Sequence, residues 1–208
     1  MGGKINRSMK FGVPIFDIEL DGYAQHRQPL IEHFLAMREE ELDDKGRSNV
    51  GGWHSRDDLL FKSNHPSVKW LVRSLAEASA QAIRQADLLP RDQDVVMSGC
   101  WVNINEAGDW NAPHLHLPDE WAGAFYLDVN NKGVSEVKSE RDGDIIFFNP
   151  LPLGVQYARA PTISAKPTNG KLFFFPGYLL HMVAPHFENK PRISVAFNLK
   201  FTPRAPAR

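Results

Sequence analysis

The sequence predicts a mainly β protein, in which a β-sandwich or jelly-roll barrel carries two helices on one outer face. Apolar residues recur at helical spacing in two segments before residue 90, but at every second position from Asp94 onward. The last expected strand, residues 193–201, has one fully apolar face. Its other face holds Arg192, Ser194, Ala196 and Asn198 and lacks Lys and Glu, which favours the inside of a small polar-lined barrel over solvent.

The first half of the chain predicts one strand and two helices. Residues 11–20 alternate as a strand, and Pro14 is typical of an edge position. Residues 29–41 and 66–86 each have a proline in the first turn and an apolar stripe at helical spacing. We expect these helices to pack on the apolar face of the last strand.

The second half predicts a succession of strands at residues 96–105, 110–116, 122–129, 143–149, 171–175 and 193–201. Alternation in the first of them places Ser98, Cys100, Val102 and Ile104 on one face and Trp101, Asn103 and Asn105 on the other. A polar hairpin is expected at 130–139 and a long Pro-rich loop at 151–170. We therefore expect a single domain over 1–208, with a strand and helical layer in 1–93 and a β core in 94–203.

Composition limits the classes of partner and the location. A chain of 208 residues with 42% hydrophobic content fits an ordinary globular domain. A formal net charge of −1 argues against nucleic acid or an anionic membrane as a partner. The single cysteine, Cys100, and the lack of an apolar run of ~18 residues lead us to expect a soluble, cytoplasmic protein.

Three histidines suggest a metal site. His114 and His116 are separated by one residue, so in a strand their imidazoles lie on the same face and can converge on one ion. His181 lies far downstream, and it is followed by Arg192 and Ser194 on one face of the last strand. The pair of histidines alone is weak evidence, whereas the combination with the other three residues is much stronger.

This combined pattern resembles the 2-oxoglutarate- and Fe(II)-dependent oxygenase superfamily. More narrowly, it resembles the family in which HxH is followed by a strand of the form (Ser/Ala)-Gly-x-(Tyr/Phe)-Tyr, here residues 122–126. The resemblance is good over residues 101–201 and looser over 11–53, in FGVPIF and GGWHS. It implies a double-stranded β-helix, also called a jelly-roll or cupin-like barrel, with Fe(II) and 2-oxoglutarate as cofactors.

The resemblance also implies a role for individual residues. The metal ligands would be His114, His116 and His181. The far carboxylate of 2-oxoglutarate would be bound by Arg192 with Ser194, since a guanidinium can bind a planar carboxylate through two parallel hydrogen bonds. Further cofactor contacts are expected from Tyr126, Asn103 and Asn198. The implied reaction is oxidative decarboxylation of 2-oxoglutarate to succinate and CO₂, coupled to hydroxylation of a substrate.

One position departs from the superfamily pattern. The usual iron site has two histidines and a carboxylate, and here His116 stands where that carboxylate would be. Either His116 is the third ligand, which the HxH spacing favours, or Asp119 or Glu120 swings in from the following loop. The alternative function is a cupin-like metal-binding barrel with a three-His site and no 2-oxoglutarate-dependent activity.

The substrate and the oligomeric state are not encoded in any motif. We expect a small-molecule or peptide substrate, selected by the loops at 43–54, 118–121 and 151–170. A homodimer could form if the expected edge strand at 11–20 paired with a second copy.

Overall fold

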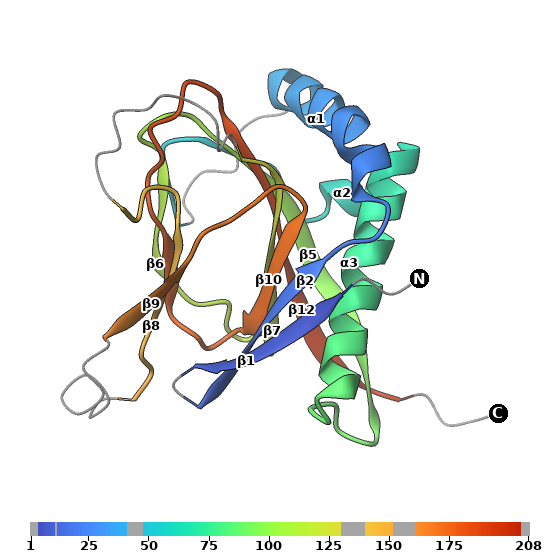
Figure 1. Cartoon of the computed structure of the whole chain (residues 1–208). Helices are drawn as coiled ribbons and strands as arrows, with labels where there is room; N and C mark the ends of the chain where they lie inside the picture. Colours follow the sequence, from blue (N-terminus) through green and yellow to red (C-terminus); the bar gives the residue numbers. More distant parts are fainter. Residues whose placement is uncertain (1–3, 11, 41–47, 130–139, 152–160, 205–208) are drawn as a thin grey trace.

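The computed structural model describes residues 4–10, 12–40, 48–129, 140–151 and 161–204, and two antiparallel sheets within these ranges face each other (Figure 1). The larger sheet has the order β1 (Ile5–Lys10), β2 (Val13–Glu19), β10 (Lys171–Pro176), β7 (Trp121–Asp128), β12 (Arg192–Pro203), β5 (Gln93–Asn105) and β4 (Trp53–His54). The smaller sheet has the order β3 (Asn49–Val50), β6 (Trp110–His114), β11 (His181–Val183), β8 (Ile145–Phe148) and β9 (Thr162–Ala165). The helices are α1 (Tyr23–Glu40), α2 (Leu59–Lys62) and α3 (Pro66–Gln85).

The helices α1 and α3 cover the outer face of the larger sheet, as predicted (Figure 1). α3 begins at Pro66, whose missing N–H would have no partner in the first turn of a helix. Its buried stripe includes Val68 and Leu71, which belong to the same core cluster as Val195 and Phe197 of β12. The apolar face of the last strand therefore packs on the helices, and its polar face is left for the space between the sheets.

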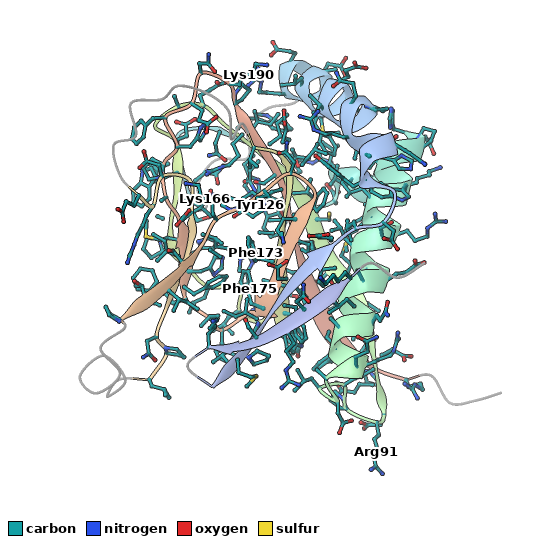
Figure 2. The ribbon with its side chains drawn as sticks, viewed as in Figure 1. Arg91, Tyr126, Lys166, Phe173, Phe175 and Lys190 are labelled. Atoms are coloured by element: carbon teal, nitrogen blue, oxygen red, sulfur yellow. The ribbon has the colours of Figure 1, made fainter. Side chains whose placement is uncertain are left out.

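A second apolar cluster lies between the two sheets. Tyr126 of β7 and Phe173 and Phe175 of β10 contribute to it from the larger sheet (Figure 2). Phe147 of β8 meets Phe175 edge-to-face, with ring centroids 4.9 Å apart. This cluster fills only part of the space between the sheets, so the sandwich retains a cavity. The double-stranded β-helix with an outer helical layer is confirmed.

The prediction of an edge strand at 11–20 is wrong. β2 pairs with β1 on one side and with β10 on the other, and Pro14 lies opposite Met9 of β1. β1 escaped prediction because five of its six residues are exposed and its sequence has no apolar alternation. Because both sides of β2 are paired, a second copy cannot pair with this strand. The homodimer stays a prediction, but pairing through residues 11–20 no longer supports it.

The first helix begins at Tyr23 rather than at residue 29, so Pro29 lies inside α1. A proline within a helix removes one backbone hydrogen bond. Tertiary contacts hold the additional turns, because the Tyr23 hydroxyl donates to the Leu127 carbonyl (2.6 Å) and Arg27 pairs with Asp128 (2.5 Å). Packing therefore overrides the local stop signal.

A β-bulge changes the faces of β5. The register of β12 against β5 shifts between Asn198 and Leu199, which leaves Ser98 without a partner residue. Met97 consequently packs against the same core as Cys100, although the two residues are three apart. The prediction that Ser98 shares the face of Cys100 is wrong for this reason.

The predicted loops are covered only in part. The hairpin expected at 130–139 and residues 152–160 of the expected long loop lie outside the described residues. The described remainder of that loop contains β9, which pairs with β8 and was not predicted. Residues 48–54 contain β3 and β4 where a loop was expected. None of the described helices has the length and the apolar run that crossing a bilayer requires.

Candidate metal and cofactor site

Three histidines converge where the smaller sheet borders the cavity. His114 ends β6, His181 begins β11, and the two are paired residues in the antiparallel ladder. His116 lies two residues beyond β6, held by a hydrogen bond from its backbone N–H to the Gly177 carbonyl (2.9 Å). One ring nitrogen from each histidine lies within 4.8 Å of the others. The predicted trio is therefore brought together, with ring centroids 4.3 to 5.1 Å apart.

The outward nitrogen of each histidine has an acceptor, and for His114 and His181 this acceptor identifies the tautomer. Nδ1 of His114 lies 2.7 Å from the Ala112 carbonyl, and Nδ1 of His181 lies 2.9 Å from the Leu179 carbonyl. A carbonyl only accepts, so both Nδ1 atoms carry the proton and both Nε2 atoms keep a lone pair. Nδ1 of His116 is likewise 2.7 Å from Oδ1 of Asn198. Such outer hydrogen bonds are the usual support of metal-bound imidazoles.

The three inward nitrogens then face one another without a proton between them. Nε2 of His116 and Nε2 of His181 are only 3.3 Å apart. Burial lowers the pKa of His114, lowers that of His116 to about 4 and lowers that of His181 well below its usual value. In each case desolvation of the charged form is the largest cause, and neighbouring imidazoles add to it for His116 and His181. At neutral pH this is a set of uncharged donors, which fits a transition-metal ion.

The carboxylates considered as alternative ligands are bound elsewhere. Asp119 accepts hydrogen bonds from Ser98 Oγ (2.5 Å) and Asn198 Nδ2 (2.9 Å), and Glu120 accepts one from the Phe201 N–H (2.9 Å). Over the described residues, the metal-binding group found here contains only the three histidines. The geometry therefore favours His116 as the third ligand over either carboxylate.

The larger sheet contributes a row of polar side chains opposite the histidines. Ser194 of β12 lies between Tyr126 of β7 and Asn103 of β5 in the paired register, and His54 of β4 extends the row. All four residues line the cavity. Burial raises the pKa of Tyr126 to about 12, so its hydroxyl keeps its proton and can donate. The described residues offer that hydroxyl no partner.

Arg192 begins β12 and is paired with Asn105 at the end of this row. Its side chain is only 3% exposed, and Nη1 makes one long hydrogen bond to the Ala184 carbonyl (3.4 Å). Nε and Nη2 have no partner among the described residues. These two nitrogens form one edge of the guanidinium, and that edge matches the two oxygens of a carboxylate. A buried cation with a free edge favours an anionic ligand.

The cavity between the two walls has a volume of about 290 Å³. Its floor on the larger sheet includes the small residues Ala124 and Ala196. One side is aromatic: Trp101 stacks on His54 (centroids 5.6 Å apart) and on His116 (6.0 Å). The cavity therefore has the three histidines on one side, a row of polar side chains on the other and enough space between them for a small molecule.

A match to a known protein family covers the segment that contains most of these site residues. Residues 99–198 match the family described as "Putative 2OG-Fe(II) oxygenase", and this segment contains the three histidines, Arg192 and Ser194. This core belongs to the 2-oxoglutarate–Fe(II) oxygenase family. The resemblance inferred from the HxH pattern is thereby confirmed. No curated relative matches the sequence significantly.

Solved structures share the fold at low sequence identity. AviO1 from Streptomyces viridochromogenes Tue57 has a TM-score of 0.62 and 14% identity, over 93% of this chain and 91% of that chain. A prolyl hydroxylase from Trichoplax adhaerens, in complex with a peptide fragment of hypoxia inducible factor, has a TM-score of 0.63 and 11% identity, over 89% of this chain and 83% of that chain. A Pseudomonas putida prolyl-4-hydroxylase has a TM-score of 0.59 and 17% identity, over 98% of this chain and 94% of that chain. These likenesses support the same double-stranded β-helix fold.

The site residues fit the cofactors of this family. Three imidazoles carry no charge, so they would leave the double charge of bound Fe(II) uncompensated, and Arg192 adds a further positive charge. At neutral pH 2-oxoglutarate is a dianion, and it would complement both positive centres. The Tyr126 hydroxyl and one edge of the Arg192 guanidinium have no partner among the described residues, and both groups can donate to a carboxylate.

Two buried polar residues of the larger sheet were not among the predicted site residues. Asn105 is fully buried, and both amide atoms lack a partner among the described residues. The alternation of β5 had placed it on the face of Asn103, so a signal was present. His54 was expected at the end of the loop 43–54, one of the loops expected to select the substrate, and it is buried in β4 and lines the cavity. No pattern within its own short strand could have shown this.

Proposed function

We propose that this 2-oxoglutarate-dependent dioxygenase hydroxylates a C–H bond in an uncharged part of a small-molecule or peptide substrate. None of the described residues that line the cavity is Asp, Glu, Lys or Arg. A charged substrate group would therefore lose its hydration without gaining an ionic partner. The rim instead presents Leu115 (45% exposed) and Leu117 (63% exposed), which suit an apolar approach.

We assign the metal to the Nε2 atoms of His114, His116 and His181. Their outer hydrogen bonds hold the rings in the tautomer that leaves these atoms free. Bound Fe(II) and 2-oxoglutarate would supply the oxidising chemistry, in which O₂ is consumed, succinate and CO₂ are released and one oxygen atom goes to the substrate. The residues of the chain bind, orient and exclude water.

We assign the far carboxylate of 2-oxoglutarate to Arg192, with Ser194 and Tyr126 beside it. Asn103 and Asn198 belong to the same polar face of the larger sheet, but Asn198 already uses both amide atoms on His116 and Asp119. We therefore propose Asn103 as a cofactor contact and Asn198 as a partner of His116 rather than of the keto acid.

One observation carries this proposal: a buried arginine with a free guanidinium edge begins β12, two residues before Ser194, and Ser194 lines the cavity that the three converging, unprotonated histidine nitrogens also border. A plain metal-binding barrel has no need of such an arginine. The cost of burying an unpaired guanidinium is offset only when an anion binds. The three-His barrel without 2-oxoglutarate thus leaves Arg192 unexplained.

The test is an anaerobic titration of the metal-free protein with Fe(II) and then with 2-oxoglutarate. We expect a visible charge-transfer band when the keto acid is added, and its loss in Arg192→Ala. Metal binding without the band would contradict the proposal and support the metal-binding barrel. Succinate formation in the presence of candidate substrates then identifies the substrate class.

We further propose a cytoplasmic location and no nucleic-acid or membrane partner. The support comes from composition: a net charge of −1 and one cysteine, which is buried as a free thiol. Fractionation of the native cells, with the protein detected by antibody, tests this directly.

A further inference from the structure

The outward nitrogen of His116 has a support unlike that of the other two histidines. His114 and His181 donate to backbone carbonyls two residues away, so the local chain decides their tautomers. His116 depends on Asn198, a side chain of β12 in the opposite sheet. An amide side chain can present either its oxygen or its nitrogen, so Asn198 alone does not decide which nitrogen of His116 carries the proton.

Asp119 removes this ambiguity. Its carboxylate is acceptor-only, so the neighbouring Asn198 must turn Nδ2 toward it, at 2.9 Å. Oδ1 of Asn198 is then directed at His116, 2.7 Å from Nδ1. Since Oδ1 can only accept, Nδ1 of His116 holds the proton and Nε2 keeps the lone pair directed at the other histidines. The negative charge of Asp119 thus sets the direction of each hydrogen bond in the chain.

The carboxylate is itself held in place from both sides. The β-bulge in β5 turns Ser98 toward Asp119, and Ser98 Oγ lies 2.5 Å from Oδ1. The backbone of the loop is tied to Gly177, whose N–H donates to the Glu120 carbonyl (2.8 Å) and whose carbonyl accepts from the His116 N–H (2.9 Å). A Cβ at Gly177 would lie 2.2 Å from the Asp119 carbonyl oxygen, so only glycine permits this contact.

We propose that Asp119 is a positioning residue for the metal site, acting on His116 through Asn198. The inference rests on the proposed role of His116 as a metal ligand. The usual site of this superfamily holds a carboxylate as a direct ligand, as the sequence resemblance implies. Here a carboxylate is retained one layer further out, where it orients and polarises the imidazole that stands in its place.

The test reads the tautomer of His116 directly in the metal-free, full-length protein, by long-range ¹H–¹⁵N correlation of ¹⁵N-histidine-labelled samples at pH 7.5. Asp119→Asn is the main variant, because asparagine preserves the shape but can donate as well as accept. We expect wild-type His116 to carry its proton on Nδ1, and the variant to contain a population with the proton on Nε2. The signals of His114 and His181 serve as internal references and stay unchanged.

Glu120→Gln is the matched control. It removes the same charge from the adjacent residue, but the Glu120 side chain bonds to the Phe201 N–H and makes no hydrogen bond to Asn198 or His116 among the described residues. Fe(II) affinity, measured anaerobically against a chromogenic chelator, is expected to fall about 10-fold in Asp119→Asn, at the lower end of typical effects for such outer residues. It is expected to stay at the wild-type value in Glu120→Gln.

A wild-type His116 protonated on Nε2 would overturn the proposal, and so would an Asp119→Asn variant with wild-type tautomer and affinity. Should Asp119→Asn not fold, Asn198→Ala breaks the same series of hydrogen bonds without changing the loop sequence. An unchanged His116 tautomer in that variant would also overturn the proposal. Because the tautomer is read without iron or 2-oxoglutarate, this result is independent of the charge-transfer test of the proposed function.

Discussion

The two walls of the cavity are prepared for their ligands in opposite ways. On the histidine wall, each outward nitrogen has an acceptor at 2.7–2.9 Å and burial keeps the rings uncharged. On the larger-sheet side, here called the arginine wall, Tyr126 lines the cavity and Arg192 is buried at the start of β12, and both have donor atoms without partners among the described residues. One wall is nearly complete before any ligand binds, and the other is not.

This difference follows from the charge of the groups. A neutral imidazole loses little hydration on burial when one nitrogen is hydrogen-bonded, whereas a guanidinium loses much and needs an anion in return. The histidine wall can therefore be assembled by the chain itself. On the arginine wall the desolvation penalty of the buried guanidinium is offset only when a carboxylate binds, so ligand binding should stabilise this side most.

The strongest way to break the histidine wall is His181→Ala. His181 is the most buried of the three, and its removal leaves two nitrogens that cannot form a closed site. We expect loss of Fe(II) binding in an anaerobic titration, with the fold retained. His26→Ala, which alters a histidine stacked on Trp70, is the control and should bind Fe(II) normally. Wild-type affinity in His181→Ala would exclude this residue as a ligand.

The arginine wall is broken by Arg192→Ala. We expect metal binding to persist while 2-oxoglutarate binding weakens by about 2–5 kcal/mol, as is typical when one partner of a buried charge pair is removed. Calorimetric titration of the metal-loaded protein measures this. Arg204→Ala, at an exposed arginine paired with Asp94, is the matched control. Unchanged 2-oxoglutarate affinity in the Arg192 variant would contradict the anchor assignment.

The ligand-free stability of an Arg192→Met variant sharpens the contrast between the walls. Methionine fills part of the same volume without a buried charge, so the metal-free and ligand-free protein should unfold at a higher denaturant concentration than wild type. Addition of 2-oxoglutarate with the metal should then stabilise wild type but not the variant. A clear loss of stability in Arg192→Met would mean that the guanidinium already has a partner in the empty protein.

The pH dependence of stability isolates the histidine wall. His116 has a pKa of about 4 in the folded protein against 6.5 when exposed, and the pKa values of His114 and His181 are lowered too. Between these pH values the unfolded chain binds more protons, so stability falls as the pH falls from about 6.5 toward 4. The contribution of His116 is about 3 kcal/mol. Denaturant unfolding with a chelator present measures it, and His116→Gln should flatten the slope.

The smallest expected effect comes from Tyr126→Phe on the arginine wall. The variant removes one hydroxyl donor, and we expect 2-oxoglutarate binding to weaken by about 1.5–3 kcal/mol, as for a hydrogen bond to a charged group. Tyr178→Phe alters an exposed tyrosine outside the cavity lining and is the control. Equal affinity in the Tyr126 variant and wild type would place the carboxylate away from this hydroxyl.

Much of the site was predictable because a strand alternates. The face that holds Arg192, Ser194 and Asn198 follows from period-two spacing, and so does the packing of Val195 and Phe197 against the helices. The HxH pair and the distant His181 were recognisable from residue type and order, which reflect the chemistry that a metal requires. These features depend on residue type and on the local geometry of a strand, which are the same wherever the segment lies in the fold.

Tertiary structure alone decided the rest. β1 has no apolar alternation and is held as a strand by its hydrogen bonds to β2. The start of α1 is held, despite Pro29, by the contacts of Tyr23 and Arg27 with the last two residues of β7. The bulge that turns Ser98 toward Asp119, and the chain from Asp119 through Asn198 to His116, join segments 21 and 79 residues apart. A sequence specifies which groups can donate or accept, but which donor meets which acceptor depends on how the sheets pack, and here that packing decides the tautomer of His116.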